Sequence, residues 1–249
     1  MSRMMRLHGK EVMILGEFEQ LALRSAQFRD WASDIDSRFD VKSIDFKSVN
    51  FSPHDKAPQV RFMTTEAEVV HPNGKRVKRV TFMRGGSVAI LLVLVCDGKE
   101  YTVLTRQPRF SIGQYAFLEI PAGTIDQGGK FAGEAARELF EETTIEIREE
   151  DLIDLIKTIY GENQKGVYAS PGGTDEYFRI FVRRMDVSME FLSSLQGKET
   201  GLASESEEIT LVVIPLQDLP LMAPDAKSLA ALTLYETAKK LGKLEYILK

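Results

Sequence analysis

The alternation of apolar and polar residues divides the chain near residue 80. In residues 17–39 apolar side chains recur at helical intervals, which predicts an amphipathic helix. Residues 59–70 and 76–83 have the composition of strands, and the Asn73-Gly74 pair between them favours a hairpin turn. The polar stretch 41–58 predicts an irregular connection. The apolar positions of the predicted helix are Phe18, Leu21, Phe28, Trp31 and Ile35.

A second pattern begins near residue 85. It predicts strands at 87–96, 101–105, 117–120, 152–160, 177–184 and 210–215, with helices at 130–144 and 225–241. Strands, a central helix, further strands and a closing helix indicate an α/β sandwich with helices on a mixed sheet. We therefore expect two domains. Residues 1–80 form a smaller N-terminal α+β subdomain, and residues 81–249 form the α/β domain.

Composition limits the classes of function. Hydrophobic residues make up 43% of the 249 residues, which suits a globular chain with a sizeable core. The formal net charge of −5 argues against a nucleic-acid binder, which would show a basic excess. Apolar runs are only of strand length, so no membrane span is expected. The single cysteine, Cys96, fits a reducing compartment, and we expect a cytoplasmic protein with organellar targeting left open.

The predicted helix at 130–144 carries an unusual acidic stripe. Residues three and four apart on a helix are neighbours, so Glu134, Glu138, Glu141 and Glu142 lie along one face. Like charges at this spacing repel each other and cost stability unless a cation neutralises them. Mg²⁺ prefers oxygen ligands and often uses a few carboxylates together with substrate phosphates. The stripe therefore favours a metal site, and the alternative is a solvated helix face.

A glycine turn precedes this helix in a fixed register. Counted from Gly123, the chain fits the pattern G-x5-E-x7-R-E-U-x-E-E-x-G-U, where U is a bulky aliphatic residue. This spacing resembles the box of the Nudix hydrolases, whose α/β/α sandwich agrees with the fold expected above. Gly129 stands at the first glutamate of the box, and Thr144 stands at its last glycine. The matching residues are Arg137, Glu138, Leu139, Glu141, Glu142 and Ile145.

The resemblance implies a metal-dependent enzyme. It assigns Glu138, Glu142 and the Ala122 carbonyl to bound Mg²⁺, with Mn²⁺ as an alternative. The box arginine, here Arg137, pairs in the family with the first glutamate. We count Arg137 and Glu141 among the catalytic residues.

The two departures from the box do not remove the residues assigned to the metal. Glu134 and Glu141 lie at helical neighbour spacing from Arg137 and can replace the acid missing at Gly129. We therefore expect an active enzyme. A catalytically silent module that binds a nucleotide or a protein is the alternative, and only Gly129 and Thr144 favour it.

Segments outside the box resemble one branch of the family. Together they are similar to nucleoside-diphosphate-sugar diphosphatases, and most to the plant type that acts on ADP-sugars. This implies hydrolysis of ADP-ribose, ADP-glucose or a related nucleotide sugar to a nucleoside monophosphate and a sugar phosphate. UDP-sugars and dinucleotides stay open, because they share the diphosphate. The segments are residues 106–109, 117–123, 168–176, 197–202, 205–209, 224–227 and 234–236.

Three residues are expected to bind the substrate. Arginine binds phosphate oxygens bidentately, so Arg84 and Arg109 suit the diphosphate. Glu176 ends a Gly/Pro loop, and the resemblance implies that it contacts a hydroxyl of the ribose or sugar. The alternatives are surface arginines and an ordinary tight turn.

An acidic run precedes the predicted strand at 210–215. The resemblance implies that this loop supplies the catalytic base and a metal ligand. We assign Glu205 as the base and Glu207 as the ligand, with Glu208 in reserve. A solvated loop is the alternative.

The resemblance also implies a homodimer in which the N-terminal subdomain helps to line the partner's pocket. Phe28 and Trp31 could serve that interface, or they could pack inside their own chain. The expected partners are a small nucleotide sugar and a second copy of the chain, with no nucleic acid and no membrane.

Overall fold

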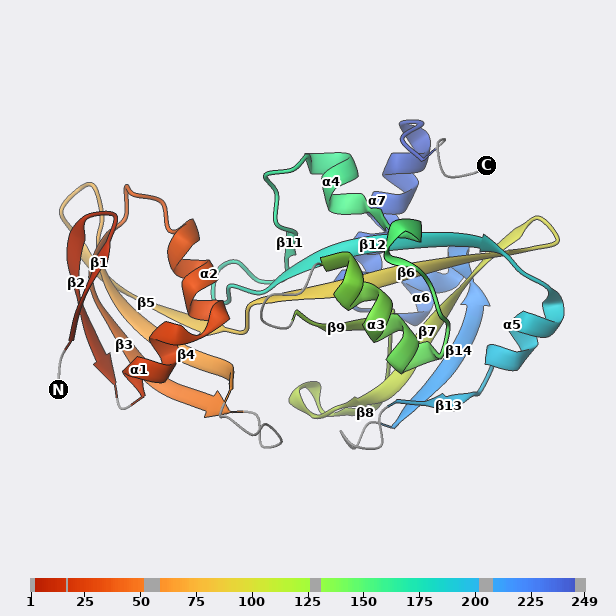
Figure 1. The fold of residues 1–249 in the computed structure, drawn as a ribbon, viewed down its shortest axis with the longest axis horizontal. Helices are drawn as coiled ribbons and strands as arrows, with labels where there is room; N and C mark the ends of the chain where they lie inside the picture. The colour runs from red at the N-terminus through yellow and green to blue at the C-terminus, as the bar shows by residue number, and fades with distance from the viewer. Residues whose placement is uncertain (1–2, 17, 52–58, 126–130, 202–207, 245–249) are drawn as a thin grey trace. The chain divides into compact units, whose positions relative to one another are not determined.

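A computed structural model describes residues 3–16, 18–51, 59–125, 131–201 and 208–244 (Figure 1). The chain divides into two compact units. The first unit comprises Met1–Gly86 and Ser170–Glu176, and the second comprises Ser87–Ala169 and Tyr177–Lys249. The sequence predicted two domains with a boundary after residue 80. That the two units are separate domains stays a prediction. None of the described helices is long and apolar enough to span a bilayer.

The first unit is built on a five-stranded sheet in the order β1-β2-β3-β4-β5. All neighbours pair antiparallel except β2 and β3, which are parallel. β4 and β5 form the predicted hairpin, whose turn includes Gly74 at φ 79°. Two helices connect β2 to β3. The bounds are β1 Arg3–Leu7, β2 Lys10–Gly16, α1 Glu19–Arg24, α2 Ala26–Asp34, β3 Asp40–Phe51, β4 Val60–Val70 and β5 Arg76–Met83.

Two expectations for the first unit were wrong. The helix expected at 17–39 is two helices, because Ser25 is extended (ψ 149°) and caps α2 by accepting a hydrogen bond from the Phe28 N–H at 3.2 Å. The irregular connection expected at 41–58 contains the twelve-residue strand β3. Register shifts at three points of the β3–β4 pairing break the two-residue alternation that would have identified this strand.

The core of the first unit lies between its sheet and its helices. Phe28 is buried here, and its ring centroid lies 5.7 Å from that of Trp31 and 5.4 Å from that of Phe46. Aromatic centroids at this separation are in favourable contact. Phe28 therefore packs inside its own chain, which was the alternative to a role in a dimer interface.

The second unit contains a nine-stranded sheet in the order β10-β12-β6-β7-β14-β13. Three short strands lie off this path: β11 pairs with β12, β8 with β7, and β9 with β6. The strands are β6 Gly86–Cys96, β7 Lys99–Arg109, β8 Gln114–Glu119, β9 Ala122–Thr124, β10 Ile153–Asp154, β11 Val167–Tyr168, β12 Tyr177–Asp186, β13 Glu199–Thr200 and β14 Ile209–Pro215. The helices are α3 Phe131–Thr143, α4 Leu155–Tyr160, α5 Met189–Leu195, α6 Leu219–Met222 and α7 Ala226–Lys240.

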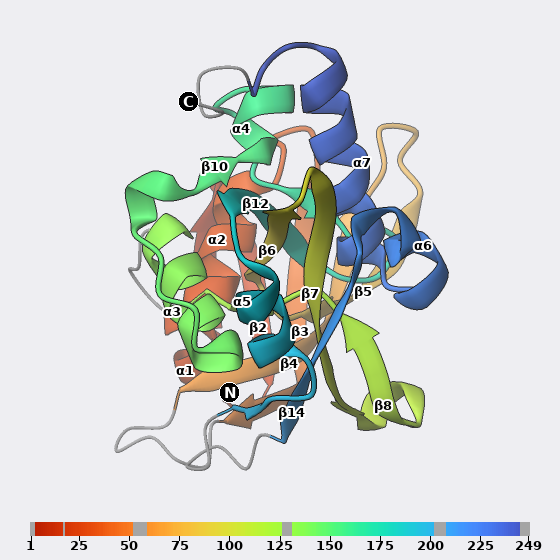
Figure 2. The ribbon, with the colours of Figure 1, turned by 90° about the vertical axis from the view of Figure 1, so that its right-hand side faces the viewer.

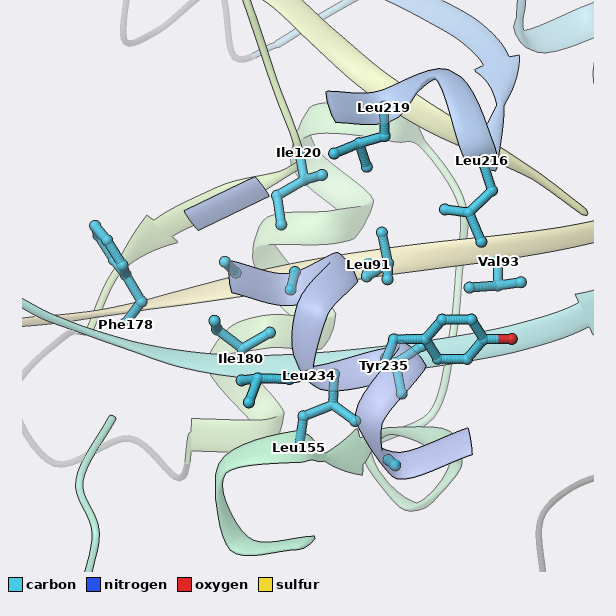
Figure 3. Close-up of a cluster of buried hydrophobic side chains, with 14 of the residues drawn as sticks. Leu91, Val93, Ile120, Leu155, Phe178, Ile180, Leu216, Leu219, Leu234 and Tyr235 are labelled. Carbon is cyan, nitrogen blue, oxygen red and sulfur yellow. The ribbon is translucent and has the colours of Figure 1, made fainter. Parts of the chain in front are cut away.

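Helices cover both faces of this sheet, which makes it the expected α/β/α sandwich. Strand β6 is buried except at Gly86 and Val95, which are partly buried, because alternate side chains enter different cores. Ala89, Leu91 and Val93 face α4, α6 and α7, whereas Ile90 and Leu92 face α3 and α5. Figure 2 shows α3 and α7 on opposite sides of the strands. In Figure 3 side chains of β6, α6 and α7 meet in the first of these cores.

One strand predicted for this unit is largely a helix. Residues 152–160 were expected to be extended, but only Ile153–Asp154 pairs with β12, and Leu155–Tyr160 forms α4. The Asp154 carboxylate accepts a hydrogen bond from the Lys157 N–H at 2.9 Å and caps the helix. An N-terminal cap of this kind favours helix over strand despite a run of apolar residues.

Candidate active site

The acidic stripe of α3 surrounds Arg137. The guanidinium lies 2.8 Å from Glu134, 2.8 Å from Glu141 and 3.0 Å from Glu138. Partial burial lowers the pKa of Arg137, but the three carboxylates outweigh this effect and raise it above its ordinary value. Glu134 and Glu141 are thus in contact with the arginine, as their helical spacing predicted. One guanidinium thus contacts three carboxylates of the stripe.

Gly123 makes room for Glu138. A Cβ atom on Gly123 would lie 1.8 Å from Cδ of Glu138 and 2.1 Å from each carboxylate oxygen, so only glycine fits while this carboxylate stays in place. The glycine belongs to β9, where it pairs with Val88 of β6. The sheet therefore holds the backbone of the Pro-Ala-Gly turn directly against the Glu138 carboxylate.

Glu142, one helical turn after Glu138, is tied to the same turn. Its side chain is nearly enclosed, and the whole residue is 5% exposed. The Ala122 N–H donates to its Oε2 atom at 3.0 Å, and Gln107 Nε2 donates to its Oε1 atom at 3.5 Å. A buried carboxylate requires such partners. Both Glu138 and Glu142 therefore meet the backbone of Ala122 and Gly123, so the helix and the turn form one site.

The donor chemistry at this turn fits a magnesium ion. Carboxylate oxygens are hard ligands, and Mg²⁺ is commonly bound by one or two of them with substrate phosphates and water completing the shell. Glu138 and Glu142 supply carboxylate oxygens of this kind beside the Ala122–Gly123 backbone. Within the described ranges, no group of three or more acidic, histidine or cysteine side chains is placed to hold a metal. Glu138 and Glu142 would share such an ion with oxygens of the backbone, the substrate or water.

Arg109, expected to bind the diphosphate, is held by a buried acid. Its Nε atom donates to Oε1 of Glu119 at 2.5 Å, and its Nη2 atom contacts the same oxygen. Lys227 of α7 contacts the other oxygen, Oε2. The Arg109 side chain is 38% exposed, so it can still reach an anion. The sequence interpretation gave Glu119 and Lys227 no role. A lone acid within an apolar strand was the signal that could have identified Glu119.

Arg84 and Glu176 meet in the first unit. Arg84 Nε lies 3.3 Å from Glu176 Oε1, and the guanidinium carbon lies 5.8 Å from the centroid of Phe62. The backbone N–H groups of Arg84 and Gly85 both donate to Oδ1 of Asp175, at 2.8 and 3.2 Å. Burial raises the pKa of Asp175 above its ordinary value, although these hydrogen bonds oppose the shift. The structure therefore fixes Arg84 beside Glu176 through the loop Ser170–Glu176.

Three residues of the sequence interpretation lie outside the described residues. They are Gly129, the assigned base Glu205 and the assigned metal ligand Glu207. The reserve residue, Glu208, is exposed and directly precedes β14. The roles given to this loop stay predictions.

The backbone conformation of Thr144 explains why the Nudix box has glycine at this position. It follows the last residue of α3 with φ 61°, in the left-handed region that β-branched residues rarely adopt. Its N–H donates to the Phe140 carbonyl at 2.7 Å and closes the helix. Lys198 Nζ donates to its hydroxyl at 2.5 Å. The threonine thus keeps the geometry that glycine would adopt without strain.

Comparisons with known proteins show the family of the chain. Residues 83–233 match the NUDIX domain family. The chain is 36% identical over 227 residues to Nudix hydrolase 14, chloroplastic, of Arabidopsis thaliana, covering 89% of this chain and 73% of the relative. It is 30% identical over 151 residues to the ADP-ribose pyrophosphatase of Bacillus subtilis (strain 168), covering 61% of this chain and 69% of the relative.

A solved structure described as the crystal structure of ADP compounds hydrolase has a similar fold. It superposes with a TM-score of 0.51 at 23% identity, covering 82% of this chain and 98% of that one. Identity at this level supports the fold alone. The family match, in contrast, covers the box and most of the second unit, and it favours an enzyme over a silent module. The chain is a hydrolase and belongs to the Nudix family.

Proposed function

We propose that this hydrolase cleaves the diphosphate bond of a nucleoside diphosphate sugar, with ADP-sugars such as ADP-ribose and ADP-glucose as the preferred class. The products are a nucleoside monophosphate and a sugar phosphate. The observation that carries the proposal is the convergence of Glu138 and Glu142 on the Ala122–Gly123 turn, beside a strand that ends in Arg109. The name of the Bacillus relative, ADP-ribose pyrophosphatase, supports the substrate class.

The side chains of the second unit account for binding of the metal and the diphosphate. Glu138 and Glu142 would hold Mg²⁺ or Mn²⁺ with the Ala122 carbonyl and Glu207. When bound, such an ion neutralises charge on the diphosphate and lowers the pKa of a coordinated water. Arg109 binds diphosphate oxygens, and Arg137 keeps Glu138 in place through their 3.0 Å contact. Positioning of this kind supplies much of the catalysis of phosphoryl transfer.

The bond-breaking step requires a base. Glu205 accepts a proton from a water, the water oxygen bonds to one phosphorus, and the bridging P–O bond breaks. Glu207 serves as a further ligand, with Glu208 in reserve. Arg84 and Glu176 are proposed substrate contacts in the first unit, where they form a pair of their own. Substitution of Glu205, Glu207 or Glu208 by glutamine, one at a time, separates these roles, because loss of the base lowers kcat more than KM.

A substrate panel tests the proposed function. The protein is incubated with Mg²⁺ and ADP-ribose, ADP-glucose, UDP-glucose or NADH, and the products are identified by mass. We expect AMP and the sugar phosphate from at least one ADP-sugar at a higher kcat/KM than for the other two compounds. Preference for UDP-glucose or NADH would contradict the ADP-sugar class, and no turnover of any compound would contradict the function.

Two further proposals concern the state of the protein in the cell. We propose a homodimer, which light scattering of the full chain tests: a mass near twice 28.0 kDa supports it, and a monomer contradicts it. We also propose a cytoplasmic location on the sequence grounds given above. The name of the Arabidopsis relative includes a chloroplast location for that protein. Microscopy of the full chain with a C-terminal fluorescent fusion distinguishes the two compartments.

A further inference from the structure

Glu119 is a buried carboxylate held between two cations from different elements. The residue is 2% exposed and ends β8, directly before the turn of the box. Arg109 of β7 donates a hydrogen bond to its Oε1 atom, and Lys227 of α7 donates one to its Oε2 atom. Lys227 also lies 3.2 Å from Asp225, and its side chain is only 11% exposed. A carboxylate buried this deeply is strongly destabilised if it loses its partners.

Lys227 lies where helix electrostatics alone would disfavour it. It is the second residue of α7, and the N-terminal end of a helix carries partial positive charge that repels cations. The Asp225 carboxylate caps the helix by accepting from the Ser228 N–H at 3.0 Å. Contact with Glu119 and Asp225, rather than stability of the helix, therefore explains a lysine at this position.

The same helix end also holds the backbone that follows Glu119. The Ile120 N–H donates to the Ser228 hydroxyl at 3.1 Å, and that hydroxyl donates to Asp225 at 2.7 Å. Ser228 is fully buried. The first turn of α7 thus fixes Glu119 by its side chain and Ile120 by its backbone, two residues before Ala122.

Lys227 and Arg109 contact different oxygens of the Glu119 carboxylate. Because the ammonium group occupies Oε2, both Nε and Nη2 of Arg109 meet the single oxygen Oε1. A carboxylate without this lysine would offer both oxygens to the planar fork of the guanidinium and bind it bidentately. Among the described contacts, Glu119 engages the Nε and Nη2 atoms of Arg109, so Nη1 is the group that can meet a phosphate oxygen.

We infer that Lys227 is a positioning residue for the diphosphate site, which acts by holding Glu119 so that Arg109 is presented to the substrate. The inference rests on the proposed function for its choice of substrate, ADP-ribose. It assigns a role to the N-terminal turn of α7. It requires that loss of the ammonium group lowers the affinity for the diphosphate and does not only lower the stability of the protein.

Kinetics of matched variants test the inference. We expect Lys227→Met to raise KM for ADP-ribose by about tenfold or more, because a charged hydrogen-bonded contact that orients Arg109 is lost. Lys227→Arg should restore KM to within about threefold, since it keeps the cation. The control is Lys239→Met, the same change in the last turn of α7, where the side chain is half exposed. We expect it to leave KM within about twofold. A lower melting temperature with unchanged KM in Lys227→Met would overturn the inference.

A double variant covers the case in which Lys227→Met fails to fold. Glu119→Gln combined with Lys227→Met removes the buried unpaired charge, so its melting temperature should be close to that of the wild type. Its KM for ADP-ribose should stay raised by about tenfold, because Arg109 has lost its orienting carboxylate. A wild-type KM in the folded double variant would overturn the inference.

Binding of inorganic pyrophosphate separates this inference from the proposed function. No turnover of any nucleotide sugar by the wild type would refute only the function. Titration calorimetry with pyrophosphate in magnesium buffer then decides the role of Lys227. Binding by the wild type that weakens about tenfold in Lys227→Met supports the inference. Equal affinities, or no binding by the wild type, would overturn it.

Discussion

The carboxylate of Glu138 occupies the space that a side chain on Gly123 would require. The distance from a Cβ atom at Gly123 to Cδ of Glu138 would be 1.8 Å, far inside van der Waals contact. This relationship joins the last residue of the Pro-Ala-Gly turn to the first proposed metal ligand of α3. The glycine of the box is therefore explained by close approach of a carboxylate, without any left-handed backbone.

Gly123→Ala should abolish activity while leaving the fold intact. The new methyl group would displace the end of the flexible Glu138 side chain, which costs little stability but moves the proposed ligand. A displacement of about 1 Å can cost about a hundredfold in rate, and we expect at least that loss of kcat/KM. Steady-state kinetics and circular dichroism measure the two effects.

Gly133→Ala is the matched control for this change. Gly133 lies in the first turn of α3, where the three atoms nearest to a Cβ atom would all belong to the exposed Glu149 side chain, with Oε1 at 2.9 Å. Alanine favours helix over glycine by about 1 kcal/mol, so this variant should be equally or more stable with unchanged kinetics. An active Gly123→Ala enzyme, or an inactive Gly133→Ala enzyme, would contradict the arrangement.

Glu138→Gln should remove turnover with little effect on folding. Glutamine has nearly the same shape but a neutral side chain that binds Mg²⁺ weakly, and we expect kcat/KM to fall by at least about a hundredfold. Glu149→Gln makes the same change at an exposed position beside α3 and should keep activity within about twofold. Activity like that of the wild type in Glu138→Gln would refute the metal assignment.

Thr144→Gly should stabilise the protein. A left-handed residue with a side chain costs about 1–2 kcal/mol, and the added freedom of glycine in the unfolded chain offsets about 0.5–1 kcal/mol of that gain. The free energy of unfolding should therefore rise by about 0.5–1 kcal/mol, measured by urea denaturation. Thr144→Ala keeps the strained φ of 61° and should give no gain. Equal stabilisation by both substitutions would show that backbone strain is not the cause.

Gly129→Glu, which restores the box pattern, should change little. Arg137 already contacts Glu134, Glu138 and Glu141, so a further acid would add only an ion pair of about 0–1 kcal/mol. We expect kcat/KM to change by less than about fivefold. A larger increase would mean that the glutamates of α3 do not replace the missing acid.

The sequence predicted the sandwich and the helix of the box well, because both follow from local periodicity, whereas the box itself was identified by its resemblance to the family pattern. The uniform apolar run at 87–96 forms β6, and the regularly spaced residues of the predicted helix at 130–144 form α3. Strand β3 was missed because its bulges disrupt the alternation, and α4 was missed because one capping aspartate outweighs an apolar run.

The candidate site was predicted only in part for a different reason. The pairing of Arg137 with Glu134 and Glu141 follows from helical spacing within one element. The contacts of Glu119 with Arg109 and Lys227 join three elements, and the Gly123–Glu138 approach joins two. Such contacts depend on tertiary packing, which spacing along the chain does not encode.

Hydrolysis of ADP-ribose in ¹⁸O-labelled water is the measurement that tests the central claim most directly. The wild type is assayed with Mg²⁺ and again with EDTA, and the masses of the products are measured by mass spectrometry. The proposed site predicts equal amounts of AMP and ribose 5-phosphate, one labelled oxygen in one of the two products, and loss of turnover with EDTA. Undiminished turnover with EDTA, or intact ADP-ribose in the presence of Mg²⁺, would contradict it.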